Sequence, residues 1–255
     1  MFSVLVIESG AGFFGRRRLF KTPRVRDVRV YGGLPFREIT TARRRGKINR
    51  EAVCAAAGRC AGSMLLPEGT APGGGISQPD LSDYKKLVFF NTACSLLRSA
   101  CGCGVRDELL IKDKNASAAR RLGIAVPLFS DIRVSTSCPE GYSRPIESAM
   151  DEFGAAVMLG ESGRAAAVID LDSSPERLIC GGEIFTAGKL ILPSACARLM
   201  PAGINTLEFA GALCLISRIH SLSQLDFSEI YHGGKTLSLS AASELIRLPR
   251  NPVGY

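Results

Sequence analysis

Apolar runs of strand length alternate with helical patterns in the middle of the chain. Three runs predict buried strands: 108–112 (ELLIK), 131–136 (DIRVST) and 155–159 (AAVML). The spacing of apolar residues predicts helical segments over about 116–122 and 142–153, and a further helix over 84–100 before the first strand. The strands begin 23 or 24 residues apart, which is the spacing of consecutive βα units in a parallel sheet.

This order predicts an α/β protein with a Rossmann-like, three-layer βαβαβ core around a parallel sheet. The pattern resembles the generic half of a doubly wound nucleotide-binding fold over about residues 105–195, and it identifies no family. Gly154 follows the second of these helical segments, where a left-handed C-cap is expected. Further elements are predicted from shorter patterns: strands at 165–171, 178–180 and 190–192, and a helix over 204–219.

The front of the chain has a different pattern. Residues 2–7 (FSVLVI) predict a buried strand, and residues 25–31 (VRDVRVY) alternate as in a strand with one wet face. An alanine-rich helix is predicted over about 48–64, with Asn49 as its N-cap. We interpret this part as a small α+β unit.

The composition of residues 67–83, with three prolines and four glycines, suits an exposed connection. It divides the chain into predicted parts: a basic α+β subdomain (1–66), a Gly/Pro-rich linker (67–83), a Rossmann-like α/β domain (84–220) and a C-terminal extension without clear period (221–255).

Positive charge is concentrated in the first 60 residues, which hold 14 Lys/Arg against 4 Asp/Glu. Such an excess attracts nucleic acid, phosphate ligands or an acidic protein surface, and it is also typical of a solvated arginine-rich face. There is little aromatic interleaving for base stacking, so nucleic acid is the weaker of these partners.

Nine cysteines are spread along the chain, mostly beside apolar residues, and no CxxC pair occurs. This usage predicts free thiols in a reducing compartment, and no metal site. No apolar run approaches the roughly 18 residues that span a bilayer, and residues 2–7 lack the basic leader of a secretory signal. We therefore expect a cytoplasmic protein with no membrane partner.

A formal GxGxxG pattern follows the first predicted strand, at Gly10, Gly12 and Gly15, and Arg16, Arg17 and Arg18 come directly after it. Glycines at this spacing cradle a pyrophosphate in dinucleotide-binding folds. The following helix would end before Pro23, and no acidic residue stands about 20 positions further on. A hairpin loop joining residues 2–7 to 25–31 explains the same glycines, so both interpretations stay open.

A candidate ligand site is predicted at the carboxyl ends of the parallel strands, where ligands of open α/β sheets bind. The residues that we expect at this edge are small or polar: Asp113, Asn115, Thr136, Ser137, Gly160 and Glu161. Asp113 has two interpretations, a phosphoryl-accepting nucleophile or the polar end of a strand, with Asn115 capping the following helix.

Two functional hypotheses follow. In the first, the chain binds a nucleotide or other phosphorylated small molecule at this edge, with the arginine-rich front part closing over the anion. In the second, the chain is a non-enzymatic interaction protein whose basic front part docks on nucleic acid or an acidic partner. The sequence identifies no cofactor, no oligomeric state and no reaction, because one fold class carries many functions.

Overall fold

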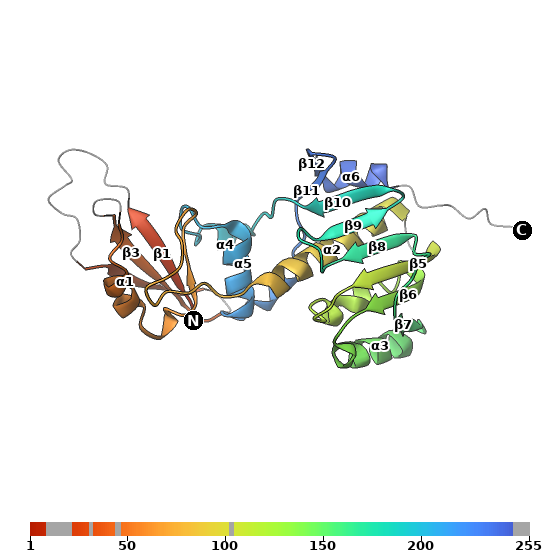
Figure 1. Ribbon diagram of the computed structural model, residues 1–255, viewed down its shortest axis with the longest axis horizontal. Helices are drawn as coiled ribbons and strands as arrows, with labels where there is room; N and C mark the ends of the chain where they lie inside the picture. Colours follow the sequence, from red (N-terminus) through yellow and green to blue (C-terminus); the bar gives the residue numbers. More distant parts are fainter. Residues whose placement is uncertain (9–21, 31–32, 44–46, 102–104, 247–255) are drawn as a thin grey trace, which may run out of the picture. The chain divides into compact units, whose positions relative to one another are not determined.

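The computed structural model describes residues 1–8, 22–30, 33–43, 47–101 and 105–246 (Figure 1). The chain divides into two compact units that are interleaved along the sequence. Unit 1 comprises Met1–Leu81 and Leu192–Ser223, and unit 2 comprises Ser82–Ile191 and Gln224–Tyr255. This division places residues 192–223 with the front of the chain, whereas the sequence pattern assigns 192–220 to the central domain and 221–223 to the C-terminal extension.

Unit 1 is built on a four-stranded sheet of order β2-β3-β1-β4. Its strands are β1 (Ser3–Glu8), β2 (Arg24–Val28), β3 (Phe36–Ala42) and β4 (Met64–Leu65). Its helices are α1 (Arg50–Ala57), α4 (Ser194–Ala197) and α5 (Thr206–Leu215), and a short 3-10 turn, η2 (Gly58–Cys60), follows α1. β1 runs parallel to both β3 and β4, and β2 pairs antiparallel with β3.

Both faces of this sheet are covered. On one face, Leu5 and Ile39 pack with Val53 of α1. On the other face, Phe2 stacks on Phe36 with ring centroids 5.3 Å apart, and Phe209 of α5 meets Phe36 edge-on at 5.5 Å. Figure 1 shows α1 and α5 on opposite sides of the β1–β3 sheet. The segment 192–223 thus completes the core of unit 1.

Unit 2 is built on an eight-stranded sheet of order β12-β11-β10-β9-β8-β5-β6-β7. In chain order its strands are β5 (Val105–Lys112), β6 (Phe129–Ser135), β7 (Val157–Leu159), β8 (Ala167–Asp170), β9 (Arg177–Cys180), β10 (Glu183–Ala187), β11 (Glu229–His232) and β12 (Lys235–Ser238). The strands β8, β5, β6 and β7 are mutually parallel, and all pairs from β8 to β12 are antiparallel.

The helical elements of unit 2 are α2 (Ser82–Cys101), η3 (Ala119–Ile124, a 3-10 helix), α3 (Pro139–Phe153) and α6 (Leu239–Leu245); a further 3-10 turn, η4 (His220–Gln224), ends the segment 192–223. The predicted α2, α3 and α5 are confirmed, and Gly154 ends α3 in the left-handed conformation with φ 64°. Asn49 caps α1 as predicted, because its side chain accepts a hydrogen bond from the Ala52 N–H. No helix in the described part of the chain is long and apolar enough to cross a membrane.

The sheet of unit 2 is buried on one face by these helices (Figure 1). Leu109, Ile111 and Phe185 point to the covered face and are fully buried. Ile184 and Tyr231 stand on the opposite face and keep 45% and 48% of their surface exposed. Among the described residues of unit 2, no helix covers that second face at these two strands. The protein is therefore a mixed α/β protein with two partly parallel sheets, and a three-layer Rossmann core in this unit is not demonstrated.

Two local predictions are corrected. The helical stretch predicted near 116–122 is the 3-10 helix η3, and Asn115 does not cap it, since no side chain caps η3. The hairpin between residues 2–7 and 25–31 is wrong: β1 lies between the parallel strands β3 and β4, and β2 pairs only with β3. β3, which the sequence pattern did not reveal, takes the place next to β1.

Candidate functional site

The predicted ligand site lies where the parallel strands of unit 2 end. Asp113 and Asn115 follow β5, Thr136 and Ser137 follow β6, and Gly160 and Glu161 follow β7. We call these six residues, together with Lys112 and Lys114, the strand-end rim.

Hydrogen bonds join neighbouring parts of the rim. The Lys114 carbonyl oxygen accepts from the Ser137 N–H at 3.1 Å and from the Thr136 hydroxyl at 3.3 Å. The Gly160 N–H donates to Val134 O at 2.9 Å, which holds the end of β7 beside β6. The turns after β5 and β6 are therefore directly connected, as parallel neighbours require.

Asp113 has a structural task in this arrangement. Its side chain is fully buried, and its carboxylate accepts three hydrogen bonds: from Ser117 N at 3.0 Å, Ala118 N at 2.8 Å and the Tyr142 hydroxyl at 2.7 Å. Burial and the neighbouring Asp113 charge raise the pKa of the Tyr142 hydroxyl, so Tyr142 acts as a neutral donor. A carboxylate so fully committed is typical of a structural residue and not of a nucleophile.

The other carboxylates near the rim are also engaged. Glu161 accepts a short hydrogen bond from the Ser135 hydroxyl. Both carboxylate oxygens of Asp172, in the loop after β8, lie 3.0 Å from the Lys114 N–H, and one lies 3.6 Å from Lys86 Nζ. The carboxylates of Glu161 and Asp172 are therefore already bound by backbone or side-chain donors of the protein.

Two ammonium groups stand in contrast to these acids. Lys112 is the last residue of β5, and the strand register places it between Ser135 of β6 and Asp170 of β8. Lys114 follows two residues later and is exposed. Neither ammonium group has an ion-pair partner among the described residues. The rim thus keeps positive charge available on its surface.

The sequence pattern predicts the turn residues of the rim but does not indicate Lys112, Lys114 or Asp172. The two lysines flank Asp113 directly, so the strand-end argument could have included them. Asp172 could not be found in this way, because its place depends on β8 pairing with β5 across the chain segment that forms β6, α3 and β7.

The second predicted site, the anion-binding set Gly10, Gly12, Gly15, Arg16, Arg17 and Arg18, lies outside the described residues. The structure does describe the strand before it. β1 ends at Glu8 as the middle strand of the parallel trio β3-β1-β4, so the competing hairpin explanation of the glycines no longer applies.

Comparisons with known proteins add no relationship: no protein-family model matches the chain, and no curated protein matches it. The geometry of the rim is therefore the basis for assigning a function.

Proposed function

We propose that unit 2 binds a phosphorylated small molecule, such as a nucleotide, at the strand-end rim. The observation that carries this proposal is that the carboxylates of the rim already have hydrogen-bond donors, whereas its two lysine side chains have no ion-pair partner in the described part of the chain. Asp113, Glu161 and Asp172 are each held by hydrogen bonds, whereas Lys112 and Lys114 have no acidic partner among the described residues. Ammonium groups of this kind bind phosphate oxygens as point charges.

The strand order also supports a ligand at this edge. β5 has β6 on one side and β8, which comes later in the chain, on the other, so the order reverses at β5. Ligands of open α/β sheets bind beyond the carboxyl ends of the strands at such a reversal. Within the sheet of unit 2, we compare only the four parallel strands β8-β5-β6-β7 with a Rossmann-like sheet.

The start of α3 lies next to the rim. α3 begins directly after the rim residue Ser137 and the N-cap Cys138, and no side chain caps it. The N-terminal end of a 15-residue helix carries partial positive charge, which favours an anion nearby. We propose binding and name no reaction, because the Asp113 carboxylate already accepts three hydrogen bonds.

The test is a thermal-stability screen of the full chain against nucleotides, sugar phosphates and short nucleic acids. A ligand at 100 times its dissociation constant stabilises the folded state by about 2.7 kcal/mol. We expect stabilisation by one class of phosphorylated small molecule, and a loss of most of that shift in the Lys112→Ala/Lys114→Ala double variant. Lys235→Ala, an exposed lysine on the edge strand β12, is the matched control and keeps the shift.

Two outcomes of the screen oppose the proposal. A shift that survives the double lysine variant places the ligand elsewhere. A shift with nucleic acid only, which disappears at high salt, favours the alternative in which the basic front part docks on nucleic acid.

A further inference from the structure

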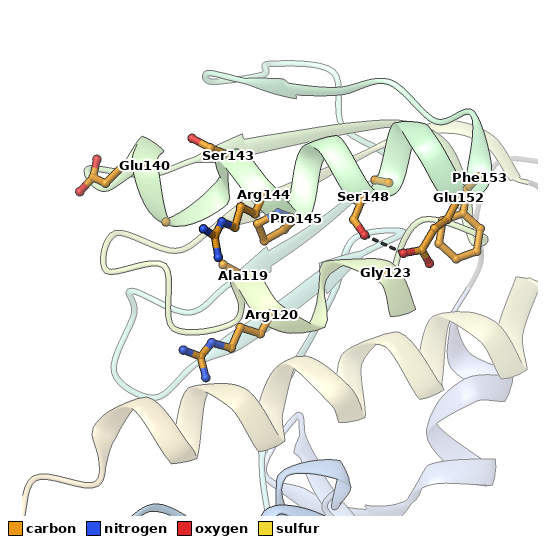
Figure 2. A pocket seen from close by; sticks show the side chains of 12 residues that line it. Ala119, Arg120, Gly123, Glu140, Ser143, Arg144, Pro145, Ser148, Glu152 and Phe153 are labelled. Carbon is orange, nitrogen blue, oxygen red and sulfur yellow. Dashed lines mark hydrogen bonds between the residues drawn. The ribbon is translucent and has the colours of Figure 1, made fainter.

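A groove of about 680 Å³ opens on the surface of unit 2 between η3 and α3 (Figure 2). η3 contributes Arg120 and Gly123 to its walls, and α3 contributes Arg144, Pro145 and Phe153. None of the strand-end rim residues lines it. The groove therefore adjoins the rim without sharing its residues: the first turn of α3, with Glu140 and Gly141, borders both. Both walls of the groove belong to one compact unit.

One end of the groove is cationic. Figure 2 shows Arg120 and Arg144 on the two facing walls, with their guanidinium groups pointing to the same side. Both residues are exposed, and neither has an ion-pair partner within the described residues. Two guanidinium forks that face a common space match the oxygens of a phosphate or a carboxylate.

The carboxylates of the groove do not neutralise this end. Glu152 accepts a hydrogen bond of 2.6 Å from the Ser148 hydroxyl toward the other end of α3. In Figure 2 the Glu140 side chain lies at the start of α3 and points away from both guanidinium groups. Neither of these two carboxylates forms an ion pair with Arg120 or Arg144 in the described part of the chain.

The opposite end of the groove is apolar. Phe153 keeps 50% of its surface exposed there, and a Cβ atom built on Gly123 would lie 4.0 Å from its ring. The absence of a side chain at Gly123 leaves room beside the ring. An apolar group placed in this space would remove the Phe153 ring from water, which favours binding.

We infer that this groove binds an amphiphilic organic anion, whose phosphate or carboxylate pairs with Arg120 and Arg144 and whose apolar group packs on Pro145 and Phe153. This inference goes beyond the proposed function, because it concerns a different site and requires an apolar group on the ligand.

Arg144 and Phe153 are nine residues apart on α3, which is about 13 Å at the helical rise, so the probe must be elongated. The test uses decyl phosphate as the probe, with inorganic phosphate and 1-decanol as its two halves, and isothermal titration calorimetry as the readout. We expect the intact probe to bind at least tenfold more tightly than either half. The Arg120→Ala/Arg144→Ala variant weakens binding at least tenfold, and Gly123→Leu does so by filling the apolar end. A parallel titration with decanoate shows whether a carboxylate serves as well as a phosphate.

The controls separate this site from the rim. Arg164→Ala, at an exposed arginine that belongs to neither the groove nor the rim, leaves the affinity of the probe unchanged. Lys112→Ala/Lys114→Ala reports any share of the probe that binds at the rim instead of in the groove. Thermal unfolding verifies that each variant is folded. Absence of probe binding, or binding that both groove variants leave unchanged, overturns the inference. Binding lost only in the lysine variant assigns the probe to the rim and overturns it as well.

Discussion

Asp113 shows how one residue shapes the candidate site. Its buried carboxylate joins the end of β5 to the turn at Ser117 and Ala118 and to Tyr142 of α3. The side chain thereby sets the path of the chain through Lys114 and Asn115, both of which stay exposed. The residue that looked most like a nucleophile in the sequence is the one that supports the others.

Replacing Asp113 by Asn therefore destabilises unit 2. The amide has one acceptor oxygen, and its NH₂ group faces backbone N–H groups that need acceptors, so we expect a loss of about 2 kcal/mol in the free energy of unfolding. Urea unfolding measures this loss. Tyr142→Phe removes only one of the three hydrogen bonds and should cost about 1 kcal/mol. An unchanged unfolding midpoint in Asp113→Asn contradicts the structural role.

Asp226 gives a prediction about pH. Burial raises its pKa above 3.8, although the hydrogen bond from the Ser95 hydroxyl, 2.8 Å long, and the nearby Arg121 and Arg98 oppose that shift. A carboxyl with a raised pKa stabilises the fold below its unfolded pKa, and this contribution is lost as the pH rises through the folded pKa.

Asp226→Asn removes this titration and keeps an acceptor for Ser95. The variant should therefore be more stable relative to the natural chain at pH 8 than at pH 4. The free energy of unfolding of the variant minus that of the natural chain should thus be larger at pH 8. Urea unfolding at the two pH values measures the difference, with the exposed Asp131→Asn as control. An equal difference at both pH values, or the reverse order, would show that burial does not raise this pKa.

At the scale of elements, the sequence predicted those whose pattern is local. β5, β6 and α3 have continuous apolar runs or helical spacing, and Gly154 marks the end of α3. β3 was not predicted because charged residues interrupt its apolar pattern. These charges are paired with residues of β2: Arg37 lies 2.8 Å from Asp27, and Glu38 lies 2.7 Å from Arg26. Pairing between strands is not visible in a single run of residues.

β10 was also missed, although a local signal for it exists. Gly181 and Gly182 join β9 to β10 with φ values of 59° and 85°, as expected for a two-residue hairpin turn. Of the candidate site, the polar strand ends could be predicted. The partners Asp172 and Lys86 could not, because strand order and helix packing bring them to the rim.

Gly154 tests the termination of α3. Its φ of 64° is the left-handed region, and no atom lies within 4 Å of the place that a Cβ atom would take, so the cost of a side chain comes from the backbone alone. Gly154→Ala should lower the free energy of unfolding by about 1 kcal/mol. Gly163→Ala is the matched control, because Gly163 also has open space and no positive φ. Equal effects of the two substitutions would contradict the left-handed cap.

At the scale of the whole molecule, the chain enters unit 2 after Leu81, returns to unit 1 at Leu192 and ends in unit 2. The returning segment is essential to unit 1, since its Phe209 completes the aromatic cluster with Phe2 and Phe36. The linker and domain boundaries were predicted from local composition. Local composition does not indicate that a later segment of the chain packs with an earlier one. A core assembled from distant segments has no signature in a local pattern.

Phe209→Ala should therefore destabilise unit 1 by about 3 to 5 kcal/mol, because a fully buried ring is lost from a packed cluster. Hydrogen exchange measured by mass spectrometry detects this as faster exchange in β1 and β3, with β5 and β6 of unit 2 unchanged. The exposed Leu215→Ala on the same helix is the control. Protection of β1 and β3 that is independent of Phe209 would contradict the assignment of α5 to this core.

We propose that the strand-end rim of unit 2 binds a phosphorylated small molecule. A titration of the ¹⁵N-labelled chain with ADP, followed by amide chemical shifts, measures such binding residue by residue. We expect saturable shifts that cluster at residues 112–117, 135–141 and 160–162. Shifts confined to residues 9–21 and 43–50, or no saturable shifts with ADP or any other phosphorylated compound of the thermal screen, would contradict this proposal.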